Sequence, residues 1–414
     1  MTPTSTATTS LLTAVGVPET RTYTFAATTV DGLIAHLDGY RKAPAASWPA
    51  TTTYSTPPDT HQVRAACCVN SPQQLEQAVT RLLAWLADGV ATRHDPRNGC
   101  FLRTAPSASP RIGLLFPGQG VPMNLGGGAW SSAFPHLAVD FPSFKTPDRP
   151  DTSVAQPAIT GASTAALTVL SALEITANVA IGHSLGELTA LYWAGSIGQA
   201  TLSHLATVRG RAMQQLGDPL GTMANLSCSP RKARALIRGL DATVACENSP
   251  LHTVIAGRRG EVARAVQRAE QAGVAGTVLD VARAFHTPLV AEAADAFAAQ
   301  LQMVPLLPPR GRVVSTVTGD ELAKDTDLAD LLTRQITAPV LFSTAVRRAD
   351  MDVDLWIEAG PGRVLTKLLP RITDTPVVAM DAGAQSLDGL QHTLAALHCA
   401  GASTNSPYPP LVTG

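Results

Sequence analysis

The 414-residue sequence has little charge, few aromatic side chains and no long apolar run. Charged residues make up 15% of the chain and the formal net charge is −1, so no overall field attracts nucleic acid or an anionic membrane. No uninterrupted apolar stretch reaches the roughly 18 residues that a membrane-spanning helix needs. We therefore expect a soluble globular protein that binds neither nucleic acid nor membranes.

Signals for secretion, disulfide bonds and metal binding are missing as well. Residues 1–10 form a polar, Thr- and Ser-rich segment without the basic and apolar parts of a signal peptide, so we expect a cytoplasmic protein. The six cysteines show no Cys-x-x-Cys spacing and no histidines at metal-ligand intervals. The sequence predicts reduced, mostly buried thiols and no metal site.

Apolar residues, in contrast, are plentiful at 45%, enough for one large core or several smaller ones. Residues 1–110 predict a small α/β unit, with strands over 21–27 and 63–69 and a helix over 30–41. A further helix is expected to begin at Pro72, with Ser71 as its N-cap.

Strands and helices alternate through residues 111–390, which predicts an α/β fold whose mostly parallel sheet is covered by helices and resembles the α/β-hydrolases. Within this region, residues 220–283 show the order strand, helix, strand, strand, helix, strand of a ferredoxin-like βαββαβ subdomain. The large subdomain then comprises residues 111–219 and 284–390. Residues 391–414 are expected to form a C-terminal tail.

Residues 179–194 are the most informative segment of the chain. An apolar, strand-like run breaks at Gly-His-Ser-Leu-Gly and resumes as a helix, the pattern of a nucleophile elbow. Gly182 and Gly186 allow the tight turn that exposes the Ser184 hydroxyl between strand and helix. Backbone N–H groups of the first helical turn then lie where an oxyanion would form.

A serine hydroxyl needs a base to become a good nucleophile, and His286 is the candidate. It follows the last predicted strand of the ferredoxin-like unit. Asp280 could serve as the acid of a hydrolase triad, although its alternation with Val278 and Val281 also suits the end of a strand.

Arg209 lies about one helix length after Ser184, beside an apolar helix face. No acidic residue stands three or four positions away, which disfavours an intrahelical ion pair. An arginine in apolar surroundings is unfavourable unless it meets an anion, and its planar guanidinium can bind a carboxylate with two hydrogen bonds. Arg209 is therefore a candidate for binding a carboxylated substrate.

Several segments carry a family resemblance, in order along the chain. They are Phe-Pro-Gly-Gln-Gly from Phe116, Gly-His-Ser-Leu-Gly-Glu from Gly182, Val-Arg-Gly-Arg-Ala-Met-Gln from Val208, Glu-Asn-Ser-Pro from Glu247, Ala-Phe-His-Thr-Pro-Leu from Ala284, Arg-Gln-Ile-Thr-Ala-Pro-Val from Arg334 and Glu-Ala-Gly-Pro-Gly-Arg-Val-Leu from Glu358. This set resembles the acyltransferase family of malonyl-CoA:acyl-carrier-protein transacylases and polyketide synthase acyltransferase domains. Residues 1–110 resemble the linker that joins such domains to a ketosynthase, which implies a piece of a larger synthase.

The resemblance implies the steps of the reaction. Ser184 would attack the thioester of malonyl-CoA while His286 takes its proton, and the N–H groups of Gln119 and Leu185 would hold the oxyanion. The backbone carbonyl of Gln335 would orient His286. The malonyl group would then pass to the phosphopantetheine thiol of an acyl carrier protein, by ping-pong kinetics and without a bound cofactor.

Substrate choice follows from the same resemblance. Arg209 would bind the malonyl carboxylate, and Phe285 before the histidine, with Leu185 after the serine, is typical of members that take malonyl rather than methylmalonyl. His183 either lines the pocket or is structural. Arg283 replaces a histidine that is common at this position in malonyl-type domains, and the sequence after Gly120 also departs from the family pattern.

Two further residues near the site have expected structural roles. Asn248 would tie the ferredoxin-like subdomain to the catalytic loop, and Glu187 would cap the elbow helix. Two other functions share these motifs: a serine thioesterase or esterase that transfers the acyl group to water, and a catalytically silent module that only docks a carrier protein.

Overall fold

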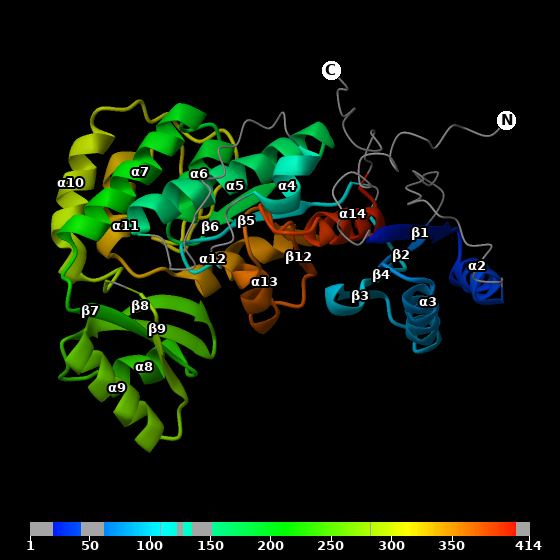
Figure 1. Cartoon of the computed structure of the whole chain (residues 1–414), viewed down its shortest axis with the longest axis horizontal. Coiled ribbons are helices and arrows are strands. Elements are labelled where there is room, and N and C mark those ends of the chain that lie inside the picture. The colour runs from blue at the N-terminus through cyan, green and yellow to red at the C-terminus, as the bar shows by residue number, and fades with distance from the viewer. Residues whose placement is uncertain are drawn as a thin grey trace.

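The computed structural model describes residues 20–42, 62–107, 109–121, 127–134, 151–281 and 283–402. The described residues form three four-stranded sheets. Figure 1 shows them side by side: the N-terminal unit at one end, the sheet of β5, β6, β11 and β12 in the middle, and a separate lobe beneath the helical body.

The N-terminal unit is an antiparallel sheet in the order β1-β2-β4-β3, with two helices on one face. Its elements are β1 (Arg21–Ala27), α2 (Val30–Lys42), β2 (Val63–Val69), α3 (Pro72–Ala87), β3 (Thr92–Asp95) and β4 (Cys100–Arg103). Ser71 caps α3 as predicted, since its hydroxyl accepts a hydrogen bond of 3.2 Å from the Gln74 N–H. Strands β3 and β4 were not predicted, because each is only four residues long and β3 is polar throughout.

The central sheet is parallel, in the order β12-β11-β5-β6. Its strands are β5 (Ile112–Phe116), β6 (Val179–Gly182), β11 (Leu355–Glu358) and β12 (Val377–Ala379). Alternate residues of β5 enter different cores: Leu114 and Phe116 pack on one side of the sheet and Leu115 on the other. Burial on both faces explains why these strands are almost continuously apolar.

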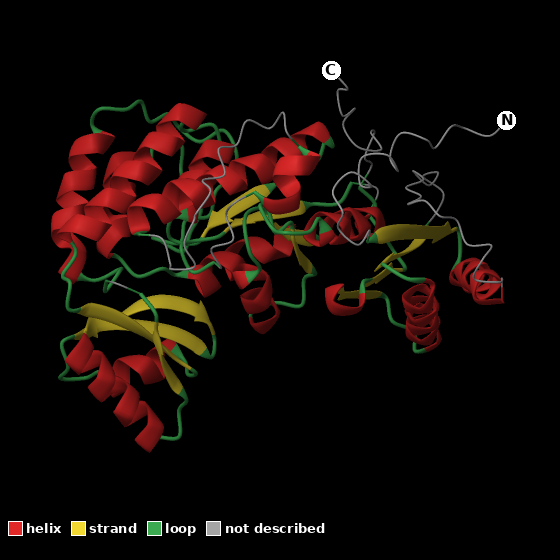
Figure 2. Cartoon of the chain, in the orientation of Figure 1, coloured by secondary structure: helices red, strands yellow, loops and turns green. Residues whose placement is uncertain are grey.

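Helices cover both faces of this sheet (Figure 2). Those on one side include α5, α6, α7, α10 and α11, and those on the other include α12 and α13. The bounds of these helices and of the short α4 are α4 (Gly128–Ala133), α5 (Thr152–Ala172), α6 (Gly186–Trp193), α7 (Gln199–Leu216), α10 (Ala291–Leu301), α11 (Leu328–Thr337), α12 (Phe342–Ala349) and α13 (Val364–Leu368).

The lobe is the predicted ferredoxin-like subdomain, with the antiparallel strand order β10-β7-β9-β8. Its elements are β7 (Gly221–Leu226), α8 (Pro230–Leu236), β8 (Ala242–Ser249), β9 (His252–Arg258), α9 (Arg259–Gln271) and β10 (Gly276–Leu279). One sheet face packs on α8 and α9, and the other contributes Met223, Val254 and Ala256 to the core shared with the central sheet. The lobe is thereby fixed against the body.

The expectation of a C-terminal tail from residue 391 is wrong for its first part. Helix α14 (Asp388–Ala400) is almost entirely buried, because it fills the space between the central sheet and the N-terminal unit. The Thr22 hydroxyl donates to Gln391 Oε1 at 2.7 Å, and Arg64 Nη1 donates to the His398 carbonyl at 3.3 Å. Residues 403–414 lie outside the described residues.

All six cysteines are free and buried. No helix in the described ranges is both long and apolar enough to cross a bilayer. The same ranges contain no group of three or more His, Cys, Asp or Glu side chains placed to hold a metal ion.

Candidate active site

Ser184 sits on a strained turn between β6 and α6. Its φ is 51°, in the left-handed region that non-glycine residues rarely adopt. The flanking glycines make the turn possible: a Cβ on Gly182 would lie 2.2 Å from the Glu187 nitrogen, and one on Gly186 would lie 2.1 Å from the Phe116 oxygen. The predicted elbow is therefore present, and its two glycines are required by close backbone contacts.

The structure brings His286 to Ser184, although the two residues are 102 positions apart. Ser184 Oγ and His286 Nε2 are 2.8 Å apart. His286 Nδ1 lies 3.1 Å from the Gln335 carbonyl oxygen and 2.9 Å from that of Ala338. Carbonyls only accept, so Nδ1 carries the hydrogen and Nε2 is free to accept the serine proton.

The two backbone carbonyls thus occupy the place that an acid holds in a hydrolase triad. The family resemblance implied that the Gln335 carbonyl orients the histidine, but it did not point to Ala338, and a backbone acceptor leaves no signature of its own in the sequence. Asp280 lines the same cavity, and the hydrogen-bond partners of His286 Nδ1 are these two carbonyls.

The environment of His286 favours its neutral form. Burial lowers its pKa to about 3, with further lowering by the positive charge of Arg209 and by His183, against the opposing effect of the two carbonyl hydrogen bonds. The imidazole is therefore unprotonated at neutral pH, as a general base must be.

Arg209 is only 1% exposed and lies beside the nucleophile. Its Nη1 donates to Gln156 Oε1 at 2.9 Å, and its Nη2 lies 3.0 Å from Gln335 Oε1 and 3.4 Å from Ser184 Oγ. Burial lowers the pKa of the guanidinium to about 9. Within the described residues no carboxylate lies within ion-pair distance of Arg209, so its charge is solvated by neutral amide oxygens and remains available to an anion.

Gln156 is a site residue that sequence reasoning missed. It is 1% exposed on α5, and its amide nitrogen donates to Gln119 Oε1 at 3.2 Å while its oxygen accepts from Arg209. Gln119 in turn donates to the Thr152 hydroxyl at 3.0 Å. The available signal was the one amide side chain in a helix otherwise made of apolar, glycine, proline and hydroxyl residues, since a buried amide needs partners.

Gln119 and Leu185 each follow the carboxyl end of one of the neighbouring parallel strands β5 and β6, so both lie at the same edge of the central sheet as Ser184. Leu185 occupies the N-cap position of α6. The Gln335 side-chain nitrogen also donates to the Ser184 carbonyl, so this glutamine contacts Ser184, His286 and Arg209 at once.

Asn248 links the two subdomains through His183: its Oδ1 lies 2.8 Å from His183 Nε2. Burial lowers the pKa of His183, which stays neutral. The prediction that Glu187 caps the elbow helix was wrong. Glu187 is fully buried, and its Oε2 accepts from the backbone N–H and hydroxyl of Thr316 at 3.2 and 3.0 Å, so it ties α6 to a loop instead.

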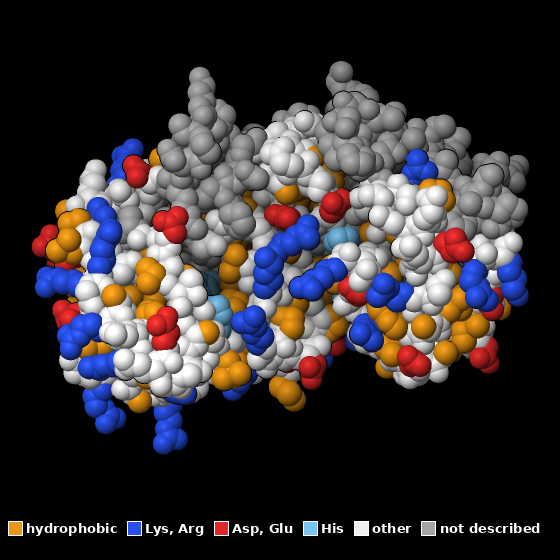
Figure 3. Space-filling model, turned by 60° about the horizontal axis from the view of Figure 1, so that its bottom comes forward, with side chains coloured by type: hydrophobic (Ala, Val, Ile, Leu, Met, Phe, Trp, Pro, Cys, Tyr) orange, Lys and Arg blue, Asp and Glu red, His pale blue; other side chains and the backbone are white. Residues whose placement is uncertain are grey.

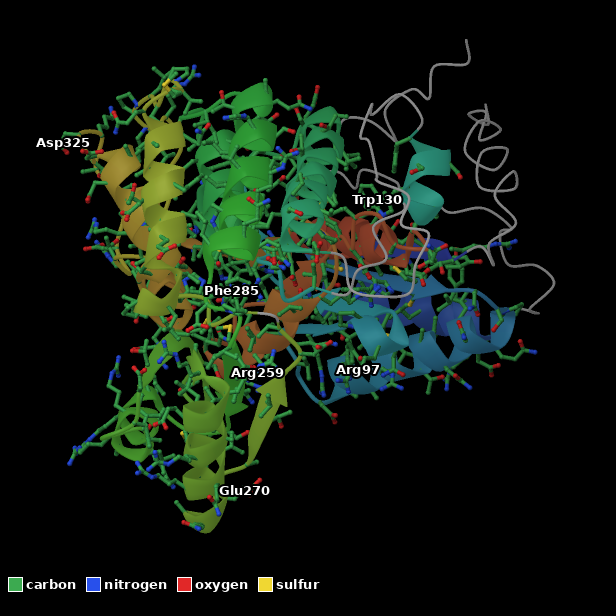
Figure 4. All side chains as sticks on the ribbon, turned by 60° about the vertical axis from the view of Figure 1, so that its left-hand side comes forward. Arg97, Trp130, Arg259, Glu270, Phe285 and Asp325 are labelled. Carbon is green, nitrogen blue, oxygen red and sulfur yellow. The ribbon has the colours of Figure 1, made fainter. Side chains whose placement is uncertain are left out.

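A cavity of about 410 Å³ opens onto Ser184 between the body and the ferredoxin-like lobe. Phe285, at the junction of lobe and body, lines it beside His286 (Figure 4). The sequence departs from the family pattern over residues 121–128, of which 122–126 lie outside the described residues. Arg283, the other departure, donates to the Gln214 carbonyl at 2.7 Å, and Gln214 lines the cavity.

Residues 137–387 match the family described as the acyl transferase domain. The chain belongs to this family. Curated relatives include the polyketide synthase GfsA of Streptomyces halstedii, 32% identical over 221 residues that cover 52% of this chain and 3% of the relative. The polyketide biosynthesis protein ThaF of Burkholderia thailandensis is 31% identical over 305 residues, covering 68% of this chain and 26% of the relative. The chain therefore spans a small share of the curated relatives it matches.

Solved structures agree with this assignment. The acyltransferase domain of an iterative polyketide synthase in enediyne biosynthesis aligns with a TM-score of 0.78 at 34% identity, over 96% of this chain and 100% of that one. Malonyl CoA-acyl carrier protein transacylase from Clostridium perfringens aligns with a TM-score of 0.64 at 27% identity, over 69% of this chain and 97% of that one. This acyltransferase domain is thus of the polyketide synthase type.

Proposed function

We propose that this acyltransferase domain moves a malonyl group from malonyl-CoA to the phosphopantetheine thiol of an acyl carrier protein, by a ping-pong mechanism. The observation that carries the proposal is the 2.8 Å contact between Ser184 Oγ and His286 Nε2, with the buried cation of Arg209 next to the same hydroxyl. Nucleophile, base and carboxylate-binding group converge on one point, as covalent transfer of an acidic acyl group requires.

In the first half-reaction, the Ser184 hydroxyl attacks the thioester carbonyl while its proton passes to His286 Nε2. Two backbone N–H groups, those of Gln119 and Leu185, stabilise the negative charge on the tetrahedral oxygen. The C–S bond then breaks, and the imidazolium returns the proton to the CoA sulfur. The product is a malonyl ester on Ser184 and free CoA thiol.

In the second half-reaction, the thiol of the carrier protein attacks this ester, with His286 again accepting the proton. Collapse of the tetrahedral intermediate returns the proton to Ser184 Oγ and leaves the malonyl group on the carrier. A thiol, with a pKa near 8.5, is an easier leaving group than an amine. Orientation of His286 by neutral carbonyls, in place of a buried carboxylate, is therefore sufficient.

Arg209 and Phe285 support malonyl as the acyl group. The malonyl carboxylate would take the place of the neutral glutamine oxygens that now accept hydrogen bonds from the buried guanidinium, and the resulting charged pair would be stronger. The Phe285 ring on the cavity wall would leave no room for a methyl branch at the malonyl C2, a preference worth about 1–3 kcal/mol.

The carrier and synthase partners are part of the same proposal. One related structure is described as an acyl carrier protein of a type II polyketide synthase in complex with its malonyl-transacylase; it aligns with a TM-score of 0.61 at 27% identity. In this chain, α14 fastens the N-terminal unit to the acyltransferase body, which suits a domain held within a larger synthase that also carries a ketosynthase.

Intact-mass analysis after mixing the protein with equal malonyl-, methylmalonyl- and acetyl-CoA tests the proposal. We expect a single malonyl adduct on Ser184 that disappears when holo carrier protein is added, with the malonyl mass appearing on the carrier. Release of free malonate at the same rate with and without carrier would identify a hydrolase. Absence of any adduct would identify a silent docking module.

A further inference from the structure

The mouth of the active-site cavity carries cations that the acyl-transfer chemistry does not use. His252, at the start of β9, lines the cavity together with Leu365 and Leu368 of α13. Arg371 is the last residue of the 3₁₀ turn Leu369–Arg371 that follows α13, and its Nη1 lies 3.3 Å from His252 Nδ1. Lys367 is exposed on α13 between the two cavity-lining leucines. In Figure 3 the hollow on this face holds histidine, and Lys and Arg side chains gather on the surface beside it.

These cations are not neutralised by neighbouring acids. Arg363, which precedes them on the same segment, pairs with Asp381 at 2.9 Å. Arg371 and Lys367, by contrast, have no carboxylate within ion-pair distance among the described residues. The surface between body and lobe therefore presents unpaired positive charge at the edge of the cavity.

The segment that carries the cations is firmly held. Glu358, at the end of β11, is fully buried and accepts hydrogen bonds from the backbone N–H groups of Leu365 and Thr366 at 3.0 and 2.7 Å. These bonds hold the backbone of α13, which carries Lys367 and leads into the turn that ends at Arg371. Cations on an ordered backbone lose less entropy on binding an anion than cations on a loose loop.

The polar side chains of His183, Asn248 and His252 line the same cavity as Ser184. Ser184 follows His183, which contacts Asn248, and His252 lies near enough for its pKa to be lowered by both His183 and Arg371, after the larger effect of burial. The guanidinium can only donate, so His252 Nδ1 accepts and its Nε2 carries a hydrogen that can be donated. The cavity that holds Ser184 is thus lined with polar groups that can bind a long polar substrate, and Arg371 contacts one of them, His252.

The proposed donor and acceptor share one chemical feature. Both present their sulfur at the end of a pantetheine arm, and both carry a phosphate at the other end of that arm. We propose that Arg371, assisted by Lys367, binds this phosphate at the cavity mouth while the thioester lies at Ser184. The inference rests on the proposed function, and it assigns one anion site to both half-reactions.

The test compares substrates that differ only by the phosphate. Rates of Ser184 acylation are measured with malonyl-pantetheine, malonyl-4′-phosphopantetheine and malonyl-CoA, in the wild type and in Arg371→Ala, Arg371→Lys and Lys367→Ala. Since Arg371 is solvent-exposed, we expect the phosphopantetheine-to-pantetheine ratio of kcat/KM to fall about 3- to 10-fold in Arg371→Ala. Lys367→Ala should lower the ratio less, and Arg371→Lys should retain part of it. Arg264→Ala, an exposed arginine on α9, is the matched control.

A second arm separates the two sources of the phosphate. Deacylation of malonyl-Ser184 is followed with pantetheine, 4′-phosphopantetheine and holo carrier protein as acceptors, at low and high salt. The wild-type preference for phosphorylated acceptors should weaken with salt, and that salt dependence should be reduced in Arg371→Ala. An unchanged ratio in Arg371→Ala would overturn the site. An effect seen with holo carrier but not with free phosphopantetheine would also overturn it, because Arg371 would then contact the carrier's own surface.

Failure of this inference is distinguishable from failure of the proposed function. Formation of the Ser184 adduct from malonyl-pantetheine in the wild type upholds the function whatever Arg371 does. If none of the malonyl thioesters formed that adduct, the proposed malonyl transfer itself would be contradicted, independently of the phosphate site.

Discussion

The central sheet and the ferredoxin-like sheet each have four strands, but they contribute to the site in different ways. The parallel strands β5, β6 and β11 are buried along their whole length, and the carboxyl ends of β5 and β6 lead into Gln119 and Ser184. Strand β10 of the lobe is an edge strand with Val278 53% exposed, and the lobe supplies cavity walls such as Asn248 and His252. The central sheet, whose strands are buried throughout, can hold Ser184 in a strained conformation, whereas the lobe sheet, with its exposed edge strand, shapes access to Ser184. His286 lies on the connection between the two.

Removing the nucleophile should have the largest effect and place the chemistry on the parallel sheet. Ser184→Ala should lose the malonyl adduct and lower transfer by roughly 10³-fold or more, since no other hydroxyl replaces it. Intact mass and a carrier-loading assay measure this. Ser203→Ala, an exposed serine on α7, is the control and should load normally. A persisting adduct in Ser184→Ala would assign the ester to another residue.

Adding a side chain at Gly186 in the elbow should reduce the transfer rate nearly as much. In Gly186→Ala the new methyl group would lie 2.1 Å from the Phe116 oxygen, so the turn must shift and misplace Ser184, with transfer falling about 100-fold. Gly198→Ala is the matched control, because a Cβ there meets nothing within 4 Å. Steady-state rates and thermal unfolding of both variants should be compared. Equal transfer rates and equal unfolding temperatures for Gly186→Ala and Gly198→Ala would mean that the elbow tolerates a shift of its backbone.

Removing the buried cation should change substrate choice more than catalysis. Arg209→Ala should lower the preference for malonyl-CoA over acetyl-CoA by roughly 10- to 100-fold, the value of a lost charged hydrogen bond pair. Arg209→Lys should restore little, because an ammonium lacks the planar fork. Arg211→Ala, exposed on the same helix, serves as control. Unaltered discrimination in a folded Arg209→Ala would place carboxylate recognition elsewhere.

Cutting the contact between lobe and elbow should have a smaller effect. Asn248→Ala leaves the buried His183 Nε2 without its partner at 2.8 Å, a loss of about 1 kcal/mol, or roughly fivefold in kcat/KM if the elbow loosens. Gln267→Ala on the outer helix of the lobe is the control. The measurement is kcat/KM with malonyl-CoA for both variants and the wild type. A loss as large as that of Ser184→Ala would show that the lobe takes part in the chemistry itself.

The smallest expected change is in the pH profile. The pKa of His286 is lowered to about 3, so the free base persists throughout the window between that value and the ordinary value of 6.5. We expect kcat/KM for acylation to change less than about twofold between pH 5.5 and 7.5, whereas a histidine of pKa 6.5 would lose about tenfold. A fall in kcat/KM with an apparent pKa near 6.5, in an enzyme that remains folded, would contradict the environment described for His286.

Burial of this histidine also affects stability in a defined direction. The unfolded chain binds a proton at His286 below about pH 6.5 while the folded chain does not until about pH 3, so its contribution to folding falls as the pH decreases through this window. The contribution of Glu187 to stability has the opposite pH dependence. Burial raises its pKa to about 7 in the folded state, so the folded state binds this proton more tightly than the unfolded chain does. The resulting stabilisation is lost as the pH rises through about 7.

Local sequence signals predicted much of the fold. The bounds of β1 and β2, the Ser71 cap and the βαββαβ order followed from periodicity and from capping residues, which act over a few neighbouring positions. The short β3 and β4, and the helical identity of residues 391–400, did not follow. Four-residue strands carry too little pattern, and the end of α14 is helical because it fills a gap between distant units.

The sequence by itself determined the parts that depend on neighbouring residues: the glycine-flanked serine, the order of strands and helices, and the motifs that mark the acyl transferase domain family. Tertiary structure decided which distant groups meet. The Ala338 carbonyl at His286, the Gln156 amide between Arg209 and Gln119, and the attachment of Glu187 to Thr316 all join segments far apart in the chain. The reason is physical: a buried polar atom must find a partner, but only the packed fold determines which one is within reach.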